Sequence, residues 1–333
     1  MAELLQPLPL TFVPVYKSYV WGGATLPQRL GRTNFPQLER YAESWELADH
    51  PDGMSVAADG PCAGETLRGL MTRFGPALTG TPAAEFPLLI KILDAADKLS
   101  VQVHPDDESA RRHGGQAKTE CWYILDAAPG ASVWAGLQPG VTPESFRRAL
   151  ETGTVAELLQ KVPVARGDLL FIPGGLVHAV GAGCLILEVQ QNSNTTYRVF
   201  DWNRTGTDGK PRELHVEEAL RVIRWREPGA ALTAPGGNAG TGNNRLRDRL
   251  ACTYFRLEEL TLREPLPVRH DGASFHALFV IRGDVRIRGA GFERIAPAGG
   301  TTLLPAILKA YELAPVGAES VVMRVSVPPV AAG

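Results

Sequence analysis

Short apolar runs separated by turn residues recur along the whole chain, and this pattern constrains the fold more than any other feature. Runs rich in Val, Ile, Leu and Phe alternate with 35 glycines and 26 prolines spread over 333 residues, as expected for β-strands joined by turns. The clearest expected strands cover residues 86–93, 100–104, 120–125, 169–172 and 184–189. So many short strands predict a mainly β fold, either a barrel or a sandwich.

Helical patterns are confined to a few expected segments, namely 64–74, 142–161 and 216–224. At the start of the second segment, Thr142 offers an N-cap and Pro143 a favourable first helical residue. Gly153 is expected to divide this segment into two helices. Residues 142–161 are therefore predicted to form a small helical insertion between strands.

A glycine-rich stretch divides the chain. Residues 234–244 read APGGNAGTGNN and hold few side chains that could pack, which is typical of a flexible linker. We therefore expect a metal-binding catalytic domain over residues 1–233, a linker over 234–248 and a C-terminal domain over 249–333.

The C-terminal part repeats two segments of the N-terminal part in weakened form. GDLLFIPGGLVH at 167–178 has a counterpart in GTTLLPAILKA at 300–310, and ECWYIL at 120–125 has one in HALFVI at 276–281. The chain is therefore predicted to contain two copies of one barrel unit. In the second copy Ala310 takes the place of His178 and no Gln-x-His pair precedes it, so only the first copy is expected to bind metal.

Charge and cysteine content exclude several functional classes. Lys and Arg number 34 and Asp and Glu number 36, a formal net charge of -2, so no global field favours nucleic acid or an anionic membrane. The first 19 residues contain three prolines and do not resemble a secretory signal, and no apolar run is long enough to span a membrane. Four scattered cysteines without a CxxC pair predict a reduced, cytoplasmic setting.

Four polar residues have the spacing of metal ligands. Gln102 and His104 alternate along one expected strand, so their side chains project on the same face about 7 Å apart. Glu120 opens another strand, and His178 follows the Pro-Gly-Gly turn that ends a third. Two imidazoles, a carboxylate and an amide oxygen suit zinc, iron, manganese or nickel. The plainer interpretation, that each is a hydrogen-bonded side chain, does not explain the charge of Glu120 in an apolar run.

Other polar and aromatic residues are given structural interpretations. Glu43 and Glu46 could be paired catalytic acids, but carboxylates at this spacing are more often surface or hydrogen-bonded groups, while Trp21 and Trp45 are expected in the core. The remaining histidines lack metal-binding partners and are expected to be structural or exposed: His50, His113, His215, His270 and His276.

Four motifs occur in an order that resembles a known family. They are SVQVHP at 100–105, KTE at 118–120, PGGLVH at 173–178 and QNSNTTYR at 191–198, and together they are similar to the short bacterial form of type I mannose-6-phosphate isomerase. The resemblance implies a double cupin fold, one zinc ion per chain, and interconversion of mannose 6-phosphate and fructose 6-phosphate through a cis-enediolate.

The resemblance also implies residue roles. Gln102, His104, Glu120 and His178 match the zinc ligands, and Arg198 and Lys118 match catalytic residues. Ser100, Lys91 and Arg212 fall near the positions that hold the phosphate, although Lys91 and Arg212 could instead be solvated surface charges. The base that takes the carbon-bound proton stays open between a metal-bound hydroxide, Lys118 and Glu188.

Two other functions are weighed against the isomerase. A cupin-type oxygenase would bind iron through two histidines and a carboxylate, but Gln102 would occupy a position that oxygen needs. A non-catalytic, sugar-binding double cupin would not need the cations Lys118 and Arg198 near its metal. We expect a small sugar phosphate as the ligand, no nucleic acid and no membrane, and a monomer or homodimer.

Overall fold

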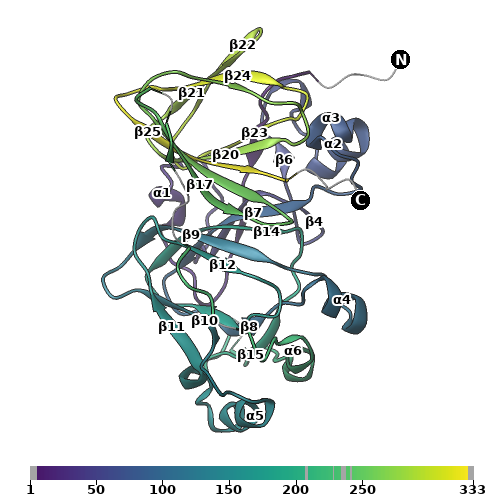
Figure 1. Cartoon of the computed structure of the whole chain (residues 1–333), viewed down its shortest axis with the longest axis vertical. Coiled ribbons are helices and arrows are strands. Elements are labelled where there is room, and N and C mark those ends of the chain that lie inside the picture. The colour runs from purple at the N-terminus through teal and green to yellow at the C-terminus, as the bar shows by residue number, and fades with distance from the viewer. Residues whose placement is uncertain (1–5, 207–208, 228, 234–237, 241, 329–333) are drawn as a thin grey trace.

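Two β-barrels stacked on each other make up the molecule (Figure 1), with the N-terminal barrel in teal and the C-terminal barrel in green and yellow. The computed structural model describes residues 6–206, 209–227, 229–233, 238–240 and 242–328. Each barrel consists of two facing antiparallel sheets. The predicted mainly β fold with two barrel units is confirmed.

The first barrel contains all five strands that the sequence predicts. Its five-stranded sheet has the order β11 (Leu159–Pro163), β10 (Ser132–Leu137), β13 (His178–Val180), β8 (Val101–Val103) and β15 (Tyr197–Phe200). Its six-stranded sheet has the order β12 (Leu169–Ile172), β9 (Glu120–Ala127), β14 (Cys184–Gln191), β7 (Leu88–Ala95), β3 (Glu43–Leu47) and β2 (Val15–Lys17).

The second barrel repeats this strand order. One sheet runs β22 (Phe292–Ala296), β21 (Val285–Gly289), β24 (Ala310–Pro315) and β19 (Leu266–Arg269). The other runs β23 (Thr301–Leu304), β20 (His276–Arg282), β25 (Ser320–Ser326), β18 (Arg256–Leu262), β17 (Arg245–Ala251) and β16 (Asn238–Ala239).

The strand register shows the repeat in detail. Glu120 pairs with Ile172 between β9 and β12, and His276 pairs with Leu304 between β20 and β23. His276 therefore stands in the second barrel where Glu120 stands in the first. His178 begins β13 and Ala310 begins β24, as the sequence repeat predicts.

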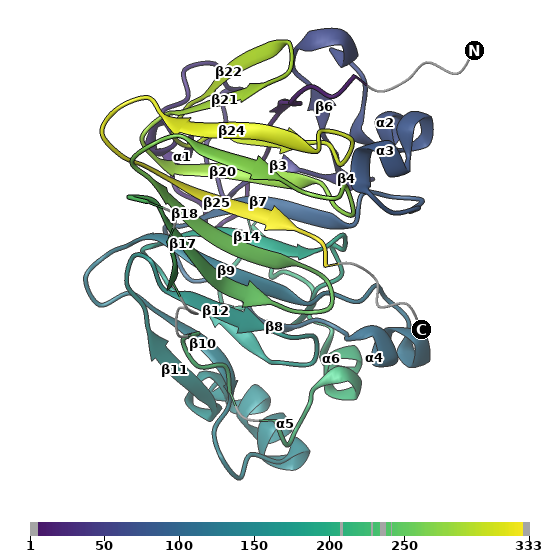
Figure 2. The same ribbon diagram turned by 45° about the horizontal axis from the view of Figure 1, so that its top comes forward.

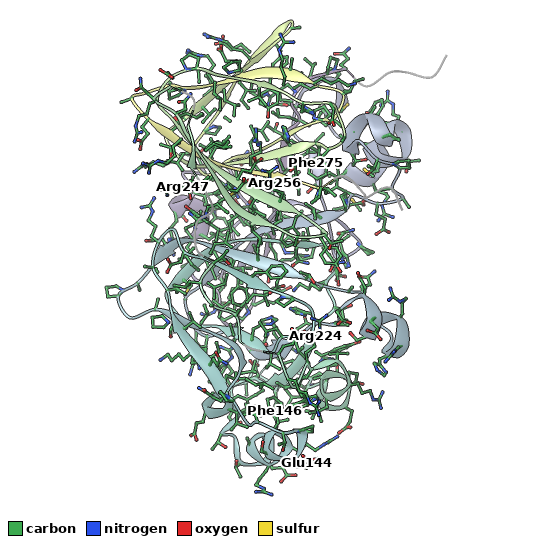
Figure 3. The ribbon with its side chains drawn as sticks, viewed as in Figure 1. Glu144, Phe146, Arg224, Arg247, Arg256 and Phe275 are labelled. Atoms are coloured by element: carbon green, nitrogen blue, oxygen red, sulfur yellow. The ribbon has the colours of Figure 1, made fainter. Side chains whose placement is uncertain are left out.

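The two barrels share an apolar core formed by their six-stranded sheets, which lie against each other in the middle of Figure 2. Alternate residues of β7, such as Leu88, Ile90 and Ile92, belong to this core, and residues of β18, β20 and β25 face them. Phe86 and Phe275 meet in it with ring centroids 4.6 Å apart, and Figure 3 labels Phe275 near the junction. Because successive strand residues point to opposite faces, the other residues of β7 point into the first barrel.

Helices cover the ends and edges of the barrels. They are α1 (Leu26–Arg29), α2 (Leu67–Phe74), α3 (Pro76–Thr79), α4 (Asp107–His113), α5 (Pro143–Thr152) and α6 (Val216–Val222), with 3-10 turns at Gly60–Cys62 and Val155–Leu158. Short strands β1 (Phe12–Val13) and β6 (Val56–Ala57) pair with each other, as do β4 (Asp49–His50) and β5 (Gly53–Met54).

The helical insertion is shorter than the sequence predicts. Thr142 caps α5 by accepting a hydrogen bond from Ser145, and the helix ends at Gly153, which adopts a left-handed conformation with φ of 72°. The expected second helix is only a 3-10 turn, because β11 already begins at Leu159. The helix α4 was not expected from the sequence. Its capping box uses Asp106 and Ser109 rather than the usual Glu or Gln at the third position.

The expected linker over 234–248 is partly strand. Residues 234–237 and 241 lie outside the described residues, whereas Asn238–Ala239 pair with Leu246 and Arg247, and β17 already begins at Arg245. Backbone pairing needs no packing side chain, so a glycine-rich composition does not exclude a short edge strand. No helix among the described residues is long and apolar enough to cross a membrane.

The contact between Phe86 and Phe275 yields a stability prediction. Phe275 is fully buried between the barrels, so Phe275→Ala should lower the free energy of unfolding by about 3–5 kcal/mol, as expected for a large cavity. Ile295→Ala, which truncates an exposed side chain, should cost less than about 1 kcal/mol. Urea unfolding followed by fluorescence measures both, and equal losses would contradict the shared core.

Candidate metal centre and active-site pocket

The four expected ligands come together inside the first barrel, from both of its sheets. Gln102 lies on β8, His104 follows that strand directly, and His178 begins the neighbouring β13, where it pairs with Gln102. Glu120 begins β9 in the opposite sheet. His104, Glu120 and His178 are each only 1% exposed, so the site lies in the barrel interior.

The distances between these side chains are those of a ligand set. Nε2 of His104 lies 3.5 Å from Oε2 of Glu120, and Nε2 of His178 lies 3.5 Å from Oε1. One ligand atom from each of these three residues lies within 4.8 Å of the others. The side-chain amide nitrogen of Gln102 lies 3.3 Å from Nε2 of His178, so a flip of that amide would turn its oxygen toward the same space.

Two backbone carbonyls orient the imidazole rings. Nδ1 of His104 lies 2.8 Å from the carbonyl oxygen of Thr195, and Nδ1 of His178 lies 2.8 Å from that of Leu176. Each ring therefore donates through Nδ1 and turns the lone pair of Nε2 toward Glu120, the usual arrangement of metal-binding histidines. The motifs containing Thr195 and Leu176 were found in the sequence, but their orienting role requires the folded backbone.

Burial keeps both imidazoles neutral. It lowers the pKa of His178 to about 4 and the pKa of His104 well below its usual value, with a further lowering from the nearby Lys118. A neutral imidazole is the form that binds a metal ion. At neutral pH the two rings are therefore ready to act as ligands.

The hydrogen bonding of the Glu120 carboxylate indicates whether the ligand set fits a metal ion. Its Oε1 accepts a hydrogen bond from Trp122 Nε1 at 3.1 Å, while the buried Oε2 accepts no hydrogen bond from any described residue. The ammonium of Lys118 lies 3.1 Å from Oε2 but forms no hydrogen bond with it, so this buried oxygen keeps an acceptor site that a metal ion could fill. Two neutral imidazoles and this carboxylate fit a divalent metal ion.

A row of alternating charges continues from the ligands along the barrel wall. Lys118 Nζ lies 3.1 Å from His104 Nε2 and 3.9 Å from Glu188 Oε1, and Glu188 Oε1 lies 3.2 Å from Lys91 Nζ. Glu43 flanks Lys91 on its other side at 3.5 Å. Burial disfavours the Lys91 ammonium, but the carboxylates of Glu188 and Glu43 outweigh this effect and raise its pKa.

Lys91 is thus a buried, paired cation and not a solvated surface charge. It is 4% exposed and pairs directly across the strands with Glu188, as residues opposite each other on β7 and β14. Of the two acids considered together in the sequence, Glu43 belongs to this row, while Glu46 bonds to Arg32 on the other face of β3. The two carboxylates are therefore not a pair.

A cavity of about 270 Å³ opens beside Gln102, one of the four expected ligands. Its wall contains all three residues expected to hold a phosphate together with both expected catalytic residues: Ser100, Lys91, Arg212, Arg198 and Lys118. Nε of Arg198 donates to Ser100 Oγ at 3.2 Å. Burial lowers the pKa of the Arg198 guanidinium, and the neighbouring Arg212 lowers it further. Both arginines line the cavity, and we call the part of its wall that they form the cationic side.

Sequence reasoning missed Tyr19 and Asp201. Tyr19 lines the cavity and stacks on Trp21 with ring centroids 5.7 Å apart, and burial with the nearby Glu43 raises its pKa to about 12. Asp201 lies behind the cavity and binds Arg212 through two hydrogen bonds. The motif FDWNR at 200–204 was a possible signal for Asp201, but its partner Arg212 comes from a separate loop.

Comparisons with known proteins give a consistent picture. The sequence model of phosphomannose isomerase type I, catalytic domain, matches residues 10–136. Mannose-6-phosphate isomerase ManA of Bacillus subtilis is 44% identical over 312 residues, which cover 92% of this chain and 95% of that protein. Mannose-6-phosphate isomerase of Streptococcus mutans is 40% identical, over 88% of this chain and 91% of that protein.

Solved structures agree with the sequence comparisons. The crystal structure of mannose 6-phosphate isomerase from Bacillus subtilis superimposes with a TM-score of 0.86 at 29% identity, over 96% of this chain and 99% of that chain. A mannose 6-phosphate isomerase bound with zinc and yttrium has a TM-score of 0.72 at 18% identity, over 95% and 98%. At that identity the second comparison shows the fold alone.

The ligand geometry predicts a specific loss of metal. Glu120→Gln removes the only carboxylate of the described ligand set and should lower the metal content of the purified protein at least tenfold, in line with the roughly 10–100-fold effects of weakened metal sites. Glu188→Gln is the matched control, because it neutralises a nearby buried carboxylate that lines the cavity and is not part of the ligand set. Elemental analysis that finds metal retained in Glu120→Gln would contradict the assignment.

The low pKa of His178 predicts a pH dependence of the metal-free protein. Its folded value of about 4 lies below its usual value of 6.5, so the unfolded chain binds a proton that the folded chain rejects. Stability should therefore be complete above pH 6.5 and fall as the pH drops toward 4. From about pH 7.5 to about pH 5.5, His178 should account for a loss of roughly 1 kcal/mol.

Urea unfolding of chelator-treated protein at the two pH values measures this loss. In His178→Gln the loss between them should be smaller by the contribution of that one imidazole. His113→Gln removes an exposed histidine and should leave the loss at its wild-type size. The same pH dependence in wild type and His178→Gln would show that His178 is not held neutral by burial.

Proposed function

The chain belongs to the type I phosphomannose isomerase family, the mannose-6-phosphate isomerases, and on that basis we propose that it interconverts mannose 6-phosphate and fructose 6-phosphate with one zinc ion. It is an enzyme, an intramolecular aldose–ketose isomerase, as its relatives at 40–44% identity over most of the chain indicate. One observation carries the assignment to this site. The cavity that Arg198 and Arg212 line is also lined by Gln102 and by Lys118, and the ammonium of Lys118 lies 3.1 Å from both His104 and Glu120.

Zinc is the metal that best suits the donor atoms. Two imidazoles and a carboxylate form a usual catalytic zinc set, and the amide of Gln102 would be a fourth ligand. A protein with the same fold is described as bound with zinc, which supports the choice. When bound, the ion supplies Lewis-acid stabilisation of the negative charge that develops on the sugar oxygens. One ion per chain is proposed, because Ala310 and His276 replace His178 and Glu120 in the second barrel.

Isomerisation needs no oxidant and no reductant. The proton on C2 of the aldose moves to C1, the aldehyde oxygen becomes a hydroxyl, and the hydroxyl oxygen on C2 becomes the ketone, through a cis-enediolate. Arg198 faces the cavity with a permanent positive charge and would stabilise the enediolate oxygens. Lys118 is the cationic side chain closest to the ligands. As the neutral amine it would take the proton from C2, and the ammonium formed, held by Glu188, would return it to C1.

The phosphate takes no part in the proton transfer and serves as a handle for binding. Ser100 and Arg212 offer a hydroxyl and a guanidinium on the cationic side of the cavity. Lys91 is neutralised by two carboxylates, so we place it against the sugar and give it less weight as a phosphate ligand. A reducing, cytoplasmic setting is proposed because the four cysteines are widely separated in the sequence and form no CxxC pair.

The alternative functions explain fewer of these observations. An iron oxygenase does not need a cationic arginine, or a further cation fixed by two carboxylates, beside its metal. A non-catalytic sugar-binding barrel does not need Lys118 within 3.1 Å of two metal ligands. The named relatives favour neither alternative.

A coupled assay for fructose 6-phosphate formed from mannose 6-phosphate tests the proposal. The purified enzyme should turn over, lose its activity after chelation and regain it when zinc is added. Arg198→Ala should keep its metal and its fold but lose roughly 100-fold in kcat, because a donor to developing negative charge is removed. Arg147→Ala is the control, because it removes an exposed arginine of α5 that pairs with Glu217. Turnover that survives chelation would refute the metal-dependent mechanism.

A further inference from the structure

Asp201 binds two arginines, Arg212 and Arg204, through its side-chain carboxylate, which lies behind the wall of the cavity. Its Oδ2 accepts from Arg212 Nε at 2.7 Å, and its Oδ1 accepts from Arg212 Nη2 at 2.6 Å. Oδ1 also accepts from Nε and Nη2 of Arg204 at 3.2 and 3.0 Å. The carboxylate is only 6% exposed. Burial opposes its charge, but the hydrogen bonds of Arg212 and Arg204 outweigh this effect and lower its pKa.

The bidentate bond fixes which edge of Arg212 faces the cavity. Nε and Nη2 are directed at Asp201, whereas Nη1 has no hydrogen-bond partner among the described residues. Arg212 lines the cavity, and Asp201 is not part of its wall. A guanidinium held in this way presents its remaining N–H groups in a fixed direction, which is what recognition of a planar or tetrahedral oxyanion requires.

The backbone after Asp201 is held in an unusual conformation. Trp202 and Asn203 both have positive φ, 57° and 54°, a conformation that is uncommon for residues other than glycine and rare for a bulky one. Trp202 Nε1 donates to the carbonyl oxygen of Leu99 at 2.7 Å, next to the cavity residue Ser100. Such conformations persist only where the surroundings enforce them, and they cluster near functional sites.

We propose that Asp201 is a positioning residue for the phosphate group of the substrate, acting through the guanidinium of Arg212. Asp201 does not touch the phosphate. It orients Arg212 toward the cavity. Arg204 binds the same carboxylate, so the negative charge of Asp201 is outnumbered by the positive charges of Arg198, Arg204 and Arg212. The inference rests on the proposed function only in naming a sugar as the carrier of the phosphate. The binding of phosphate itself does not depend on that function.

The direction in which Asp201→Asn changes the affinity for phosphate distinguishes an effect of orientation from an effect of charge. Asp201→Asn removes a negative charge near the phosphate, so if charge alone mattered, phosphate would bind more tightly. If Asp201 acts by orientation, phosphate should bind more weakly, because Arg212 loses its bidentate partner. Asp97→Asn is the matched control. It removes a carboxylate that binds Arg204 at 3.0 Å and makes no contact with Arg212.

The test measures the dissociation constant of inorganic phosphate by calorimetry on the zinc-loaded protein, alongside KM and kcat for mannose 6-phosphate. Asp201→Asn should raise the dissociation constant and KM roughly tenfold, as expected for coupled neighbouring groups, while kcat changes less than about twofold. Asp97→Asn should bind phosphate as tightly as wild type or slightly more tightly. Asp201→Glu, which keeps the charge but displaces the carboxylate, should show an intermediate loss and carries the test if Asp201→Asn fails to fold.

A double-mutant cycle identifies the route of the effect. In an Arg212→Gln background, Asp201→Asn should cause no further weakening of phosphate binding. Tighter phosphate binding by Asp201→Asn, or an undiminished effect in the Arg212→Gln background, would overturn the inference. Wild-type protein that binds no phosphate would overturn it as well. If phosphate binding depends on Asp201 but mannose 6-phosphate is not turned over, the proposed function fails and the positioning role stands.

Discussion

The six-stranded sheet of the first barrel is buried on both faces, and the site depends on this constraint. On β7, Ile90 and Ile92 face the second barrel while Lys91 faces the interior of the first. On β14, Leu187 likewise faces the second barrel and Glu188 faces the interior of the first. A charged residue on such an inner face has little water available, so it must be paired. The cross-strand pairing of Lys91 with Glu188 meets this requirement and at the same time lines the cavity.

The second barrel therefore supports the site, although none of its described residues belongs to the candidate ligand set or lines the cavity. Its own six-stranded sheet covers the outer apolar face of the first barrel, and the two sheets share one core cluster. Loss of this cover would expose a contiguous apolar surface on the strands that carry Glu120, Lys91 and Glu188. Of the three strands that carry the candidate ligands, β9 lies in the covered sheet, and packing at native density on both of its sides holds Glu120 in position.

The strands and the clustering of the candidate ligands could be predicted because both follow from local sequence patterns. Alternation places Gln102 beside His104, and a carboxylate in an apolar run marks Glu120. Contacts between distant segments could not be predicted in this way, and the bond between Asp201 and Arg212 depends on how a loop returns to the barrel. The interpretation of Glu43 and Glu46 as possible paired acids overlooked a simple rule. Residues three apart on a strand face opposite sides, and the two carboxylates do so here.

A comparison of the two barrels distinguishes residues that the fold requires from residues that the metal centre requires. Arg324 of β25 pairs with Glu258 of β18 at 2.8 Å, in the register positions that Glu188 and Lys91 occupy in the first barrel. An ion pair is thus present at this point in both barrels, with its charges exchanged, so the pair itself does not define a catalytic barrel. The difference lies at the first residue of β20, where His276 replaces Glu120. Its Nδ1 bonds to the hydroxyl of Tyr311 at 2.6 Å, and burial lowers its pKa to about 3. A neutral ring bonded to a tyrosine supplies no anionic ligand, and Ala310 supplies no ligand at all, so among its described residues the second barrel has no counterpart of Glu120 or of His178.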